Sequence, residues 1–439
     1  MVYREVLKKI IVEQRSQFLE VANPIPRDVL LSSDFKKIIR LKEAVIITGV
    51  RRSGKSYLLK MIWQKISADS KIGKDDFLYV NFEDERLLKF EAQDFGTLIE
   101  AYYELFPVVD GKKIHLFFDE IQIIEGWEKF INRLIREERF KIFITGSNAT
   151  LLSKEINTAL TGRAYPLALF PLSFKELARY RRGGKLPAAD LYEPATRAAI
   201  KKVFGQYLEN GGFPEVVLQN FRPLLQEYLK NIIYRDIVSR YKIKHEASLR
   251  EIVAFVISNI GTGASLENIA KMTKMKNLMT VKNYLSYLEN SFLFYRISKY
   301  SHSIKKQIYN PDKFYCVDTG LYNEIAFVNS ANRGRILENF VYMELKRKNK
   351  EIFYYRGKKE CDFLVKEKNK LTAAIQVTAF LNDGDKEREI GGLLEAMSEY
   401  GIKQGLILTE DESASIKQGG RTIQVRPIWQ WCLDEAGGL

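Results

Sequence analysis

The feature that most restricts the fold of this chain is the segment Gly49–Ser56, with the sequence GVRRSGKS. It matches the pattern GxxxxGK[ST], in which glycines let backbone N–H groups wrap around phosphates. The apolar run Ala44–Gly49 precedes the segment, and apolar residues at helical spacing follow it. A strand, a glycine-rich turn and a helix whose positive end faces the turn together predict a nucleotide-binding P-loop.

The chemistry of a P-loop gives each part of this segment an expected role. Lys55 should reach the β- and γ-phosphate oxygens of ATP, and the Ser56 hydroxyl should be a ligand of Mg²⁺. We expect the nucleotide to contact the whole loop and the residue after it, namely Gly49, Val50, Arg51, Arg52, Ser53, Gly54, Lys55, Ser56 and Tyr57.

An acidic pair, Asp119 and Glu120, ends the apolar run that begins at His115. Downstream of a P-loop, this pattern predicts that Asp119 holds Mg²⁺ through water and that Glu120 polarises the attacking water. A glutamate directly after the aspartate favours hydrolysis over a switch or kinase role. The alternative is an acidic pair that merely ends a strand.

Further candidate residues follow the acidic pair. Ser147 and Asn148 end the predicted strand 141–147, where an ATPase with an additional strand senses the γ-phosphate. They could equally cap a helix over residues 149–156. Arg163 could stabilise transition-state charge on a neighbouring subunit's nucleotide, bind the phosphate of its own chain, or form a structural ion pair.

The order of apolar runs predicts three domains. Residues 42–170 alternate strand-like runs with helical spacing, as in a parallel sheet connected by helices. Residues 195–294 are almost wholly helical, and a second α/β segment follows. The expected strands are 44–49, 77–82, 115–120, 141–147, 352–356, 360–366, 373–378 and 405–408, with a helix at 336–349. The simplest division is 1–194, 195–300 and 301–439.

The charge balance favours an anionic partner. The chain has 69 Lys and Arg against 55 Asp and Glu, a formal net charge of +14, and such an excess favours nucleic acid through counterion release. A surface rich in Lys and Glu can also serve solubility or heat tolerance. The three cysteines lie far apart, which argues against a zinc site or a disulfide framework. No apolar run reaches the ~18 residues needed to span a bilayer, so we expect a cytoplasmic protein without a membrane partner.

The segment 247–297 has the pattern of a helix-turn-helix followed by a wing. Apolar residues at helical spacing would pack the last two helices together. The exposed face would carry Lys274, Lys276, Asn277, Thr280, Lys282 and Asn283. Such side chains can touch phosphates and base edges, so we expect DNA contact here. The alternative is a lid or a protein-interaction module with a solvated basic face.

Several motifs taken together resemble a known family. GVRRSGKS, YVNFEDERL, HLFFDEIQ, FITGSNATLLSKE, GRAYPLALFPLSFKEL, NGGFPEV and YRDIVSRY, in this order, resemble archaeal and bacterial AAA+-type ATPases of the ExE/STAND-related branch. The resemblance implies a P-loop core, a winged-helix segment and a C-terminal nuclease-like domain. It also implies that Glu120 and Arg163 are catalytic.

The last segment resembles the core of PD-(D/E)XK nucleases, in which a helix acid, a strand aspartate and an ExK triplet hold Mg²⁺ and activate water. Glu338, Asp362 and Gln376 would occupy the metal-ligand places. Gln376 replaces an acid, and Thr378 stands where the lysine should be; Lys346 could take that role if the geometry allowed. Lys358 and Lys359 form a basic edge suited to phosphate. DNA binding alone, weak metal-dependent cleavage and a structural or docking role remain open.

The combined prediction is an α/β protein with a parallel P-loop sheet, a helical and winged-helix middle and a restriction-endonuclease-like end. We expect an ATP-hydrolysing, DNA-associated ATPase that uses Mg²⁺ and forms a homo-oligomer, with a hexamer as the candidate assembly. Its DNA would be duplex or branched. The alternative is an ATP-dependent regulatory switch whose C-terminal domain docks a protein partner.

Overall fold

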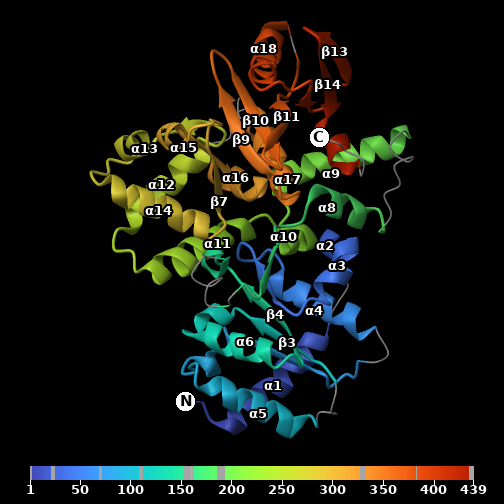
Figure 1. The fold of residues 1–439 in the computed structure, drawn as a ribbon, viewed down its shortest axis with the longest axis vertical. Helices are drawn as coiled ribbons and strands as arrows, with labels where there is room; N and C mark the ends of the chain where they lie inside the picture. The colour runs from blue at the N-terminus through green and yellow to red at the C-terminus, as the bar shows by residue number, and fades with distance from the viewer. Residues whose placement is uncertain are drawn as a thin grey trace. The chain divides into compact units, whose positions relative to one another are not determined.

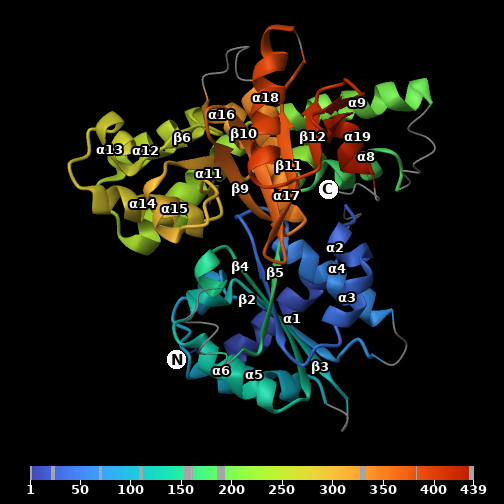
Figure 2. The same cartoon turned by 45° about the horizontal axis from the view of Figure 1, so that its top comes forward.

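The fold is that of a computed structural model. The structure describes residues 2–20, 25–68, 72–107, 112–152, 160, 162–184, 193–326, 333–381 and 383–434. The chain divides into two compact units, Met1–Phe170 and Pro171–Leu439, and each is described by itself. Figures 1 and 2 show the elements of both units in two orientations.

The first unit is built on a five-stranded parallel sheet with the order β2-β3-β4-β1-β5. Its strands are β1 (Ala44–Thr48), β2 (Phe77–Asn81), β3 (Ile114–Asp119), β4 (Phe140–Gly146) and β5 (Ala164–Ala168). β4 lies between β1 and β3, so it is the additional strand that the sequence suggested. The predicted P-loop sheet is confirmed.

Helices cover both faces of this sheet (Figure 1). One core cluster joins the strands to α1 (Arg4–Leu19), α5 (Asp94–Leu105) and α6 (Trp127–Arg136). The other joins them to α3 (Ser33–Ile38) and α4 (Lys55–Ser67). The remaining elements are the short helices α2 (Asp28–Leu31), η1 (Glu85–Leu87), η2 (Ile121–Ile123) and η3 (Ala149–Leu152). Strands covered on both faces must be apolar throughout, which explains why they read as continuous apolar runs.

The second unit begins with a helical part, as the sequence predicts. Its helices are α8 (Phe174–Arg181), α9 (Pro194–Asn210), α10 (Pro214–Gln219), α11 (Leu224–Asn231), η5 (Ile232–Ser239), α12 (Glu246–Ser258), α13 (Leu266–Met272), α14 (Leu278–Asn290) and α15 (Ile304–Tyr309). A small antiparallel sheet with the order β6-β8-β7 joins the last of them, from β6 (Gly263–Ala264), β7 (Phe294–Ile297) and β8 (Asp312–Cys316). The expected boundary at residue 300 therefore falls between two paired strands.

A six-stranded mixed sheet ends the second unit, with the order β13-β14-β12-β11-β10-β9. Its strands are β9 (Glu351–Arg356), β10 (Glu360–Glu367), β11 (Lys370–Val377), β12 (Gln404–Thr409), β13 (Ala414–Gln418) and β14 (Arg421–Pro427). The accompanying helices are α16 (Thr319–Ile325), α17 (Arg333–Arg347), α18 (Asp383–Glu399) and α19 (Ile428–Leu433). Phe363 contacts Tyr342 of α17, whereas Leu364 packs with Leu393 of α18. Adjacent strand residues point to opposite faces, so the two helices cover opposite faces of the sheet.

No helix in the described ranges combines the length and the apolar character needed to cross a bilayer.

Candidate functional site

The predicted P-loop forms a turn between β1 and α4. Arg52 and Gly54 both have positive φ, 69° and 96°, and α4 begins at Lys55. Glycine adopts such a conformation without strain, which lets the loop close tightly before the helix. The Lys55 side chain is buried, and its ammonium lies 3.2 Å from the carbonyl oxygen of Gly49 and 3.3 Å from that of Val50. The loop therefore holds its lysine against its own backbone.

Gly49 lies where no larger residue fits. A Cβ atom added there would come within 2.0 Å of the Leu169 carbonyl oxygen. The Leu169 N–H donates to the Thr48 carbonyl oxygen at 2.7 Å. The start of the P-loop is thus packed directly against the segment that follows β5.

The acidic pair lies at the carboxyl end of β3, next to the end of β4. Tyr79 and Thr145 both donate to the Asp119 carboxylate, Tyr79 at 3.1 Å. The same Thr145 hydroxyl accepts the backbone N–H of Glu120 at 3.0 Å. One threonine on the additional strand therefore fixes both residues of the pair. The sequence did not predict the roles of Tyr79 and Thr145, because these residues are distant from Asp119 in the chain and approach it only in the folded sheet.

Glu120 faces the P-loop. One of its carboxylate oxygens lies 3.5 Å from the Lys55 ammonium, and Gln122 donates to the other. Burial raises the pKa of Glu120, but Lys55, Gln122 and Arg51 outweigh it, so the pKa is lowered. Burial and, second, the charge of Glu120 raise the pKa of Asp119. Two adjacent carboxyl groups thus have environments that separate their pKa values.

The residues predicted to hold Mg²⁺ at this site lie together. Ser56, in the first turn of α4, makes a side-chain hydrogen bond with Asp119. A hydroxyl beside a buried carboxylate supplies the hard oxygen donors that Mg²⁺ prefers. The arrangement of Ser56 and Asp119 fits the predicted metal role.

Ser147 and Asn148 follow β4 and are fully buried. Ser147 makes a side-chain hydrogen bond with Glu120. Because β4 lies between β1 and β3, its carboxyl end falls between the P-loop and the acidic pair. Residues 149–152 form the short helix η3, and the rest of the predicted helix 149–156 lies outside the described residues. The sensing role of Ser147 and Asn148 stays a prediction.

Arg163 lies far from the P-loop of its own chain. Its carbonyl oxygen accepts the N–H of Ala44, at the amino end of β1, and its guanidinium lies 3.3 Å from the Asn132 side-chain oxygen. The P-loop follows the carboxyl end of the same strand, roughly 15 Å away at about 3.3 Å per residue. An arginine side chain does not span that distance, so this placement does not support contact with the phosphates of its own chain.

Arg27 supports the P-loop from outside the motif. Its guanidinium donates to the carbonyl oxygens of Ser53, at 3.0 Å, and of Phe170, at 2.6 Å, and its side chain is buried. Ser53 belongs to the P-loop, so Arg27 fixes the loop backbone relative to residues after β5. No sequence signal pointed to Arg27, because its partners are backbone atoms distant in the chain.

We expect Arg27→Met to weaken ATP binding about tenfold. The substitution removes two charge-assisted hydrogen bonds in a buried setting, each worth roughly 1.5–3 kcal/mol, and the loop loses part of its preorganisation. Nucleotide titration by calorimetry measures the change. The ATP affinity of Arg27→Lys should lie between those of the parent protein and Arg27→Met. A single ammonium can bond one of the two carbonyl oxygens well, but not both. Arg4→Met, which removes an exposed arginine paired with Glu100 and Glu104, is the matched control. Unchanged ATP affinity in Arg27→Met contradicts this role.

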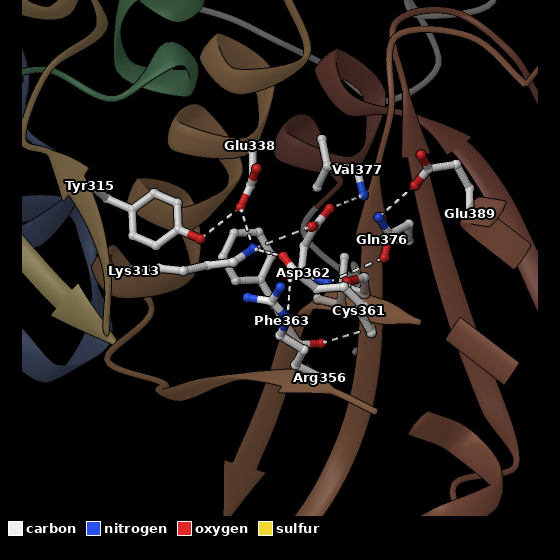
Figure 3. A network of polar contacts seen from close by, with 12 residues as sticks. Lys313, Tyr315, Glu338, Arg356, Cys361, Asp362, Phe363, Gln376, Val377 and Glu389 are labelled. Carbon is white, nitrogen blue, oxygen red and sulfur yellow. Dashed lines mark hydrogen bonds and ion pairs between the residues drawn. The ribbon is translucent and has the colours of Figure 1, made fainter. Parts of the chain in front are cut away.

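A second cluster of charged side chains lies in the second unit, where β8, α17 and β10 meet (Figure 3). Glu338, Asp362 and Gln376, the three predicted metal ligands, do come together there. The Lys313 ammonium lies 3.2 Å from Glu338 and 3.6 Å from Asp362. The Gln376 side-chain oxygen accepts the Asp362 N–H at 3.2 Å. Lys313 was missed because its strand belongs to a different sheet from Asp362.

The metal role expected for Glu338, Asp362 and Gln376 stays a prediction. Over the part of the chain that the structure describes, no group of three or more His, Cys, Asp or Glu side chains is arranged to hold a metal ion. The lysine near the acids is Lys313, not Lys346, which lies over the Tyr295 ring at 5.5 Å. Thr378 donates to the Phe380 carbonyl oxygen.

The residues predicted to contact DNA are largely exposed. Lys274, Lys276 and Lys282 are exposed around the start of α14, and Thr280 is half-buried. Asn277 caps α14 by accepting the N–H groups of Met279 and Thr280. The helix buries the opposite face, including Val281, Tyr284, Leu285 and Leu288.

Lys358 and Lys359 form the exposed turn between β9 and β10. Both backbone N–H groups donate to the Glu395 carboxylate, at 2.8 and 3.0 Å. The Lys359 ammonium reaches the Glu387 carbonyl oxygen at 2.7 Å. The turn is therefore fixed against α18, and the Lys358 side chain lies exposed at its tip.

Comparison with known proteins gives the family. Residues 41–178 match an AAA domain, residues 201–332 match a domain of unknown function (DUF8612), and residues 333–431 match another (DUF4143). An uncharacterized protein of Methanocaldococcus jannaschii is 33% identical over 453 residues, covering 99% of this chain and 96% of its own length. An uncharacterized protein of Haemophilus influenzae is 33% identical over 74% of this chain and 80% of its own length.

Among solved structures, Cdc6p from Pyrobaculum aerophilum aligns over 68% of this chain and 93% of its own length, at 12% identity and a TM-score of 0.29. The P-loop, the acidic pair and the AAA match agree with one another, and the archaeal relative matches from end to end. The chain therefore belongs to the family of that M. jannaschii protein, and its first unit is a P-loop AAA ATPase domain.

Proposed function

We propose that this protein hydrolyses ATP and uses the cycle to change how its second unit engages duplex or branched DNA. The observation that carries the proposal is the pairing of an ATPase site with exposed lysines at the start of α14. The first gives an energy source, and the second gives a surface suited to phosphates.

The ATPase chemistry follows from the contacts around Lys55 and Glu120. Lys55 would exchange its contacts with Gly49, Val50 and Glu120 for the β- and γ-phosphate oxygens. Glu120, left ionised, would orient the attacking water and accept its proton. Ser56 and Asp119 would hold Mg²⁺, which neutralises phosphate charge when it is bound.

Loss of the γ-phosphate would change the contacts of groups on more than one element. Lys55 begins α4, Glu120 follows β3, and Ser147 follows β4 while bonding Glu120. Groups on three elements that share one phosphate can change their arrangement together when it leaves. Arg163, at the far edge of the sheet, would serve a neighbouring subunit's nucleotide in a homo-oligomer, and a hexamer remains the candidate assembly.

The topology around α14 supports DNA contact. The order α12, β6, α13, α14, β7, α15, β8, with β8 between β6 and β7, fits the predicted winged helix, with α15 inserted between β7 and β8. In helix-turn-helix proteins, the N-terminal residues of the second helix contact base edges. Lys276 and Lys282 lie at and near that end of α14. The exposed turn with Lys358 and Lys359 would add phosphate contacts from the six-stranded sheet, called the nuclease-like sheet below.

DNA should raise the ATPase rate severalfold, and the double variant Lys276→Glu, Lys282→Glu should lose that response while keeping its basal rate. Each lost phosphate contact should lower the slope of log K against log salt concentration by about 1. Phosphate release is measured with linear duplex, single-stranded and branched DNA, with gel shifts in parallel. Lys202→Glu, an exposed lysine on α9, is the matched control. An ATPase rate indifferent to all three DNAs contradicts the proposal.

One observation favours the alternative for the segment 247–297, a protein-interaction module in place of a DNA contact. Met272, Leu278 and Met279 are 61%, 41% and 60% exposed beside the same lysines. Exposed methionines are common at adaptable protein-binding surfaces. Under this alternative DNA leaves the ATPase rate unchanged, and Met279→Asp abolishes partner binding without altering the basal rate.

A further inference from the structure

The Lys313 ammonium lies at the centre of three carboxylates. It is 2.6 Å from Glu360, 3.2 Å from Glu338 and 3.6 Å from Asp362, and only 1% of its side chain is exposed. Figure 3 shows Lys313 pointing from β8 toward Glu338 and Asp362. Mg²⁺ needs oxygen ligands at about 2.0–2.1 Å and usually keeps several waters. The ammonium occupies the space in which such an ion and its waters would lie.

The other oxygen atoms of the cluster already have neighbours. Tyr315 donates to the Glu338 oxygen that faces Lys313, at 2.7 Å. The second Glu338 oxygen lies close to Gly261, where an added Cβ would come within 2.6 Å. The Val377 N–H donates to the second Asp362 oxygen at 2.9 Å. These two acids therefore have little room to turn toward a metal ion.

The Gln376 amide is also engaged by protein groups. That oxygen accepts the Asp362 N–H, and the amide nitrogen donates to Glu389 at 2.6 Å. Gln376 thus links β10 to α18. Its side chain is therefore held at both ends of the amide by protein groups.

The charges of the cluster support a permanent internal cation. Burial lowers the pKa of Lys313, but Glu338, Asp362 and Glu360 outweigh it, so the pKa is raised and the ammonium stays charged. Burial, and second the charge of Glu338, raise the pKa of Asp362 well above its usual value. Burying a charge away from water costs free energy, and nearby carboxylate partners offset that cost for the Lys313 ammonium.

We infer that the Lys313 ammonium takes the position of a divalent cation, so that the folded protein binds no divalent metal at Glu338, Asp362 and Glu360. The nuclease-like sheet then has no metal-activated water and does not cleave phosphodiesters. This inference rests on the contacts within the second unit and does not depend on ATP hydrolysis or DNA association.

The test is Mn²⁺ binding by the full-length, nucleotide-free protein, followed through the electron paramagnetic resonance signal of free Mn²⁺. Lys313→Ala should gain one Mn²⁺ site per chain, with at least about tenfold higher affinity at this cluster than in the parent protein, since the side chain no longer fills the space and three carboxylates then face each other. Adding Asp362→Asn to that variant should remove the new site. Lys346→Ala, which removes a half-buried lysine of the same unit, should gain none. Mn²⁺ bound near Asp119 would be the same in all variants, so it does not affect the difference in binding between them.

Two results overturn the inference. One is a folded Lys313→Ala protein that binds no more Mn²⁺ than the parent. The other is a parent protein with a saturable Mn²⁺ site that Asp362→Asn removes. The comparison of the parent with Asp362→Asn decides the question if Lys313→Ala does not fold, and equal binding by these two proteins supports the inference.

Discussion

Lys55→Met should abolish measurable ATP hydrolysis. The Lys55 ammonium lies 3.5 Å from Glu120, and Lys55 begins the helix α4, whose positive end would face the phosphates. Removing one preorganised donor to developing charge lowers kcat by about 10²–10³-fold, and lost ATP affinity adds to the effect. Methionine keeps most of the bulk, so the substitution tests the charge. Phosphate release and nucleotide titration measure the two effects separately.

Lys60→Met is the matched control for this variant. Lys60 lies on the same helix, with its ammonium 2.8 Å from the Gln17 carbonyl oxygen, and its loss should leave hydrolysis near the parent rate. If Lys55→Met kept the ATP affinity and turnover of the parent, the assignment of the nucleotide site to this loop would be wrong.

Glu120→Gln should separate binding from turnover. The amide keeps the size of the side chain but cannot accept a proton from water, and a positioned general base contributes about 10²–10⁴-fold. ATP binding should persist, because Lys55 loses one competing contact and becomes freer to meet the phosphates. A calorimetric titration with ATP and a single-turnover assay together distinguish the two steps.

The control for Glu120→Gln is Glu125→Gln, an exposed acid a few residues later in the same loop. It should behave as the parent. A Glu120→Gln protein that turns over ATP at the parent rate would remove Glu120 from the chemistry and leave Asp119 as the residue to test next.

The sequence predicted the P-loop unit well, because each element carries its own local signal. β1 to β4 are continuous apolar runs, and the residues of the nucleotide site follow their carboxyl ends. β5 was missed, because none of the residues of this edge strand is fully buried and it contains Pro166. Edge strands tolerate proline, and they lack the continuous apolar run of a central strand.

Contacts between distant segments could not be predicted from the sequence. Lys313 and Asp362 come from two different sheets, and their proximity depends on how α17 packs against both. Arg27 binds backbone oxygens, which carry no residue identity. In the same way, the pairing of β7 with β8 places residues 312–316 with the helical part, although the change of sequence pattern near residue 300 suggested a boundary.

The close packing of Gly49 against Leu169 has a mechanical consequence. A Cβ atom has no room between them, and Arg27 ties the same loop to Phe170. A shift of the loop backbone when triphosphate arrives or leaves must therefore displace residues 169 and 170. Those residues are the last of the first unit. A displacement of Phe170 therefore also moves Pro171, to which it is covalently joined.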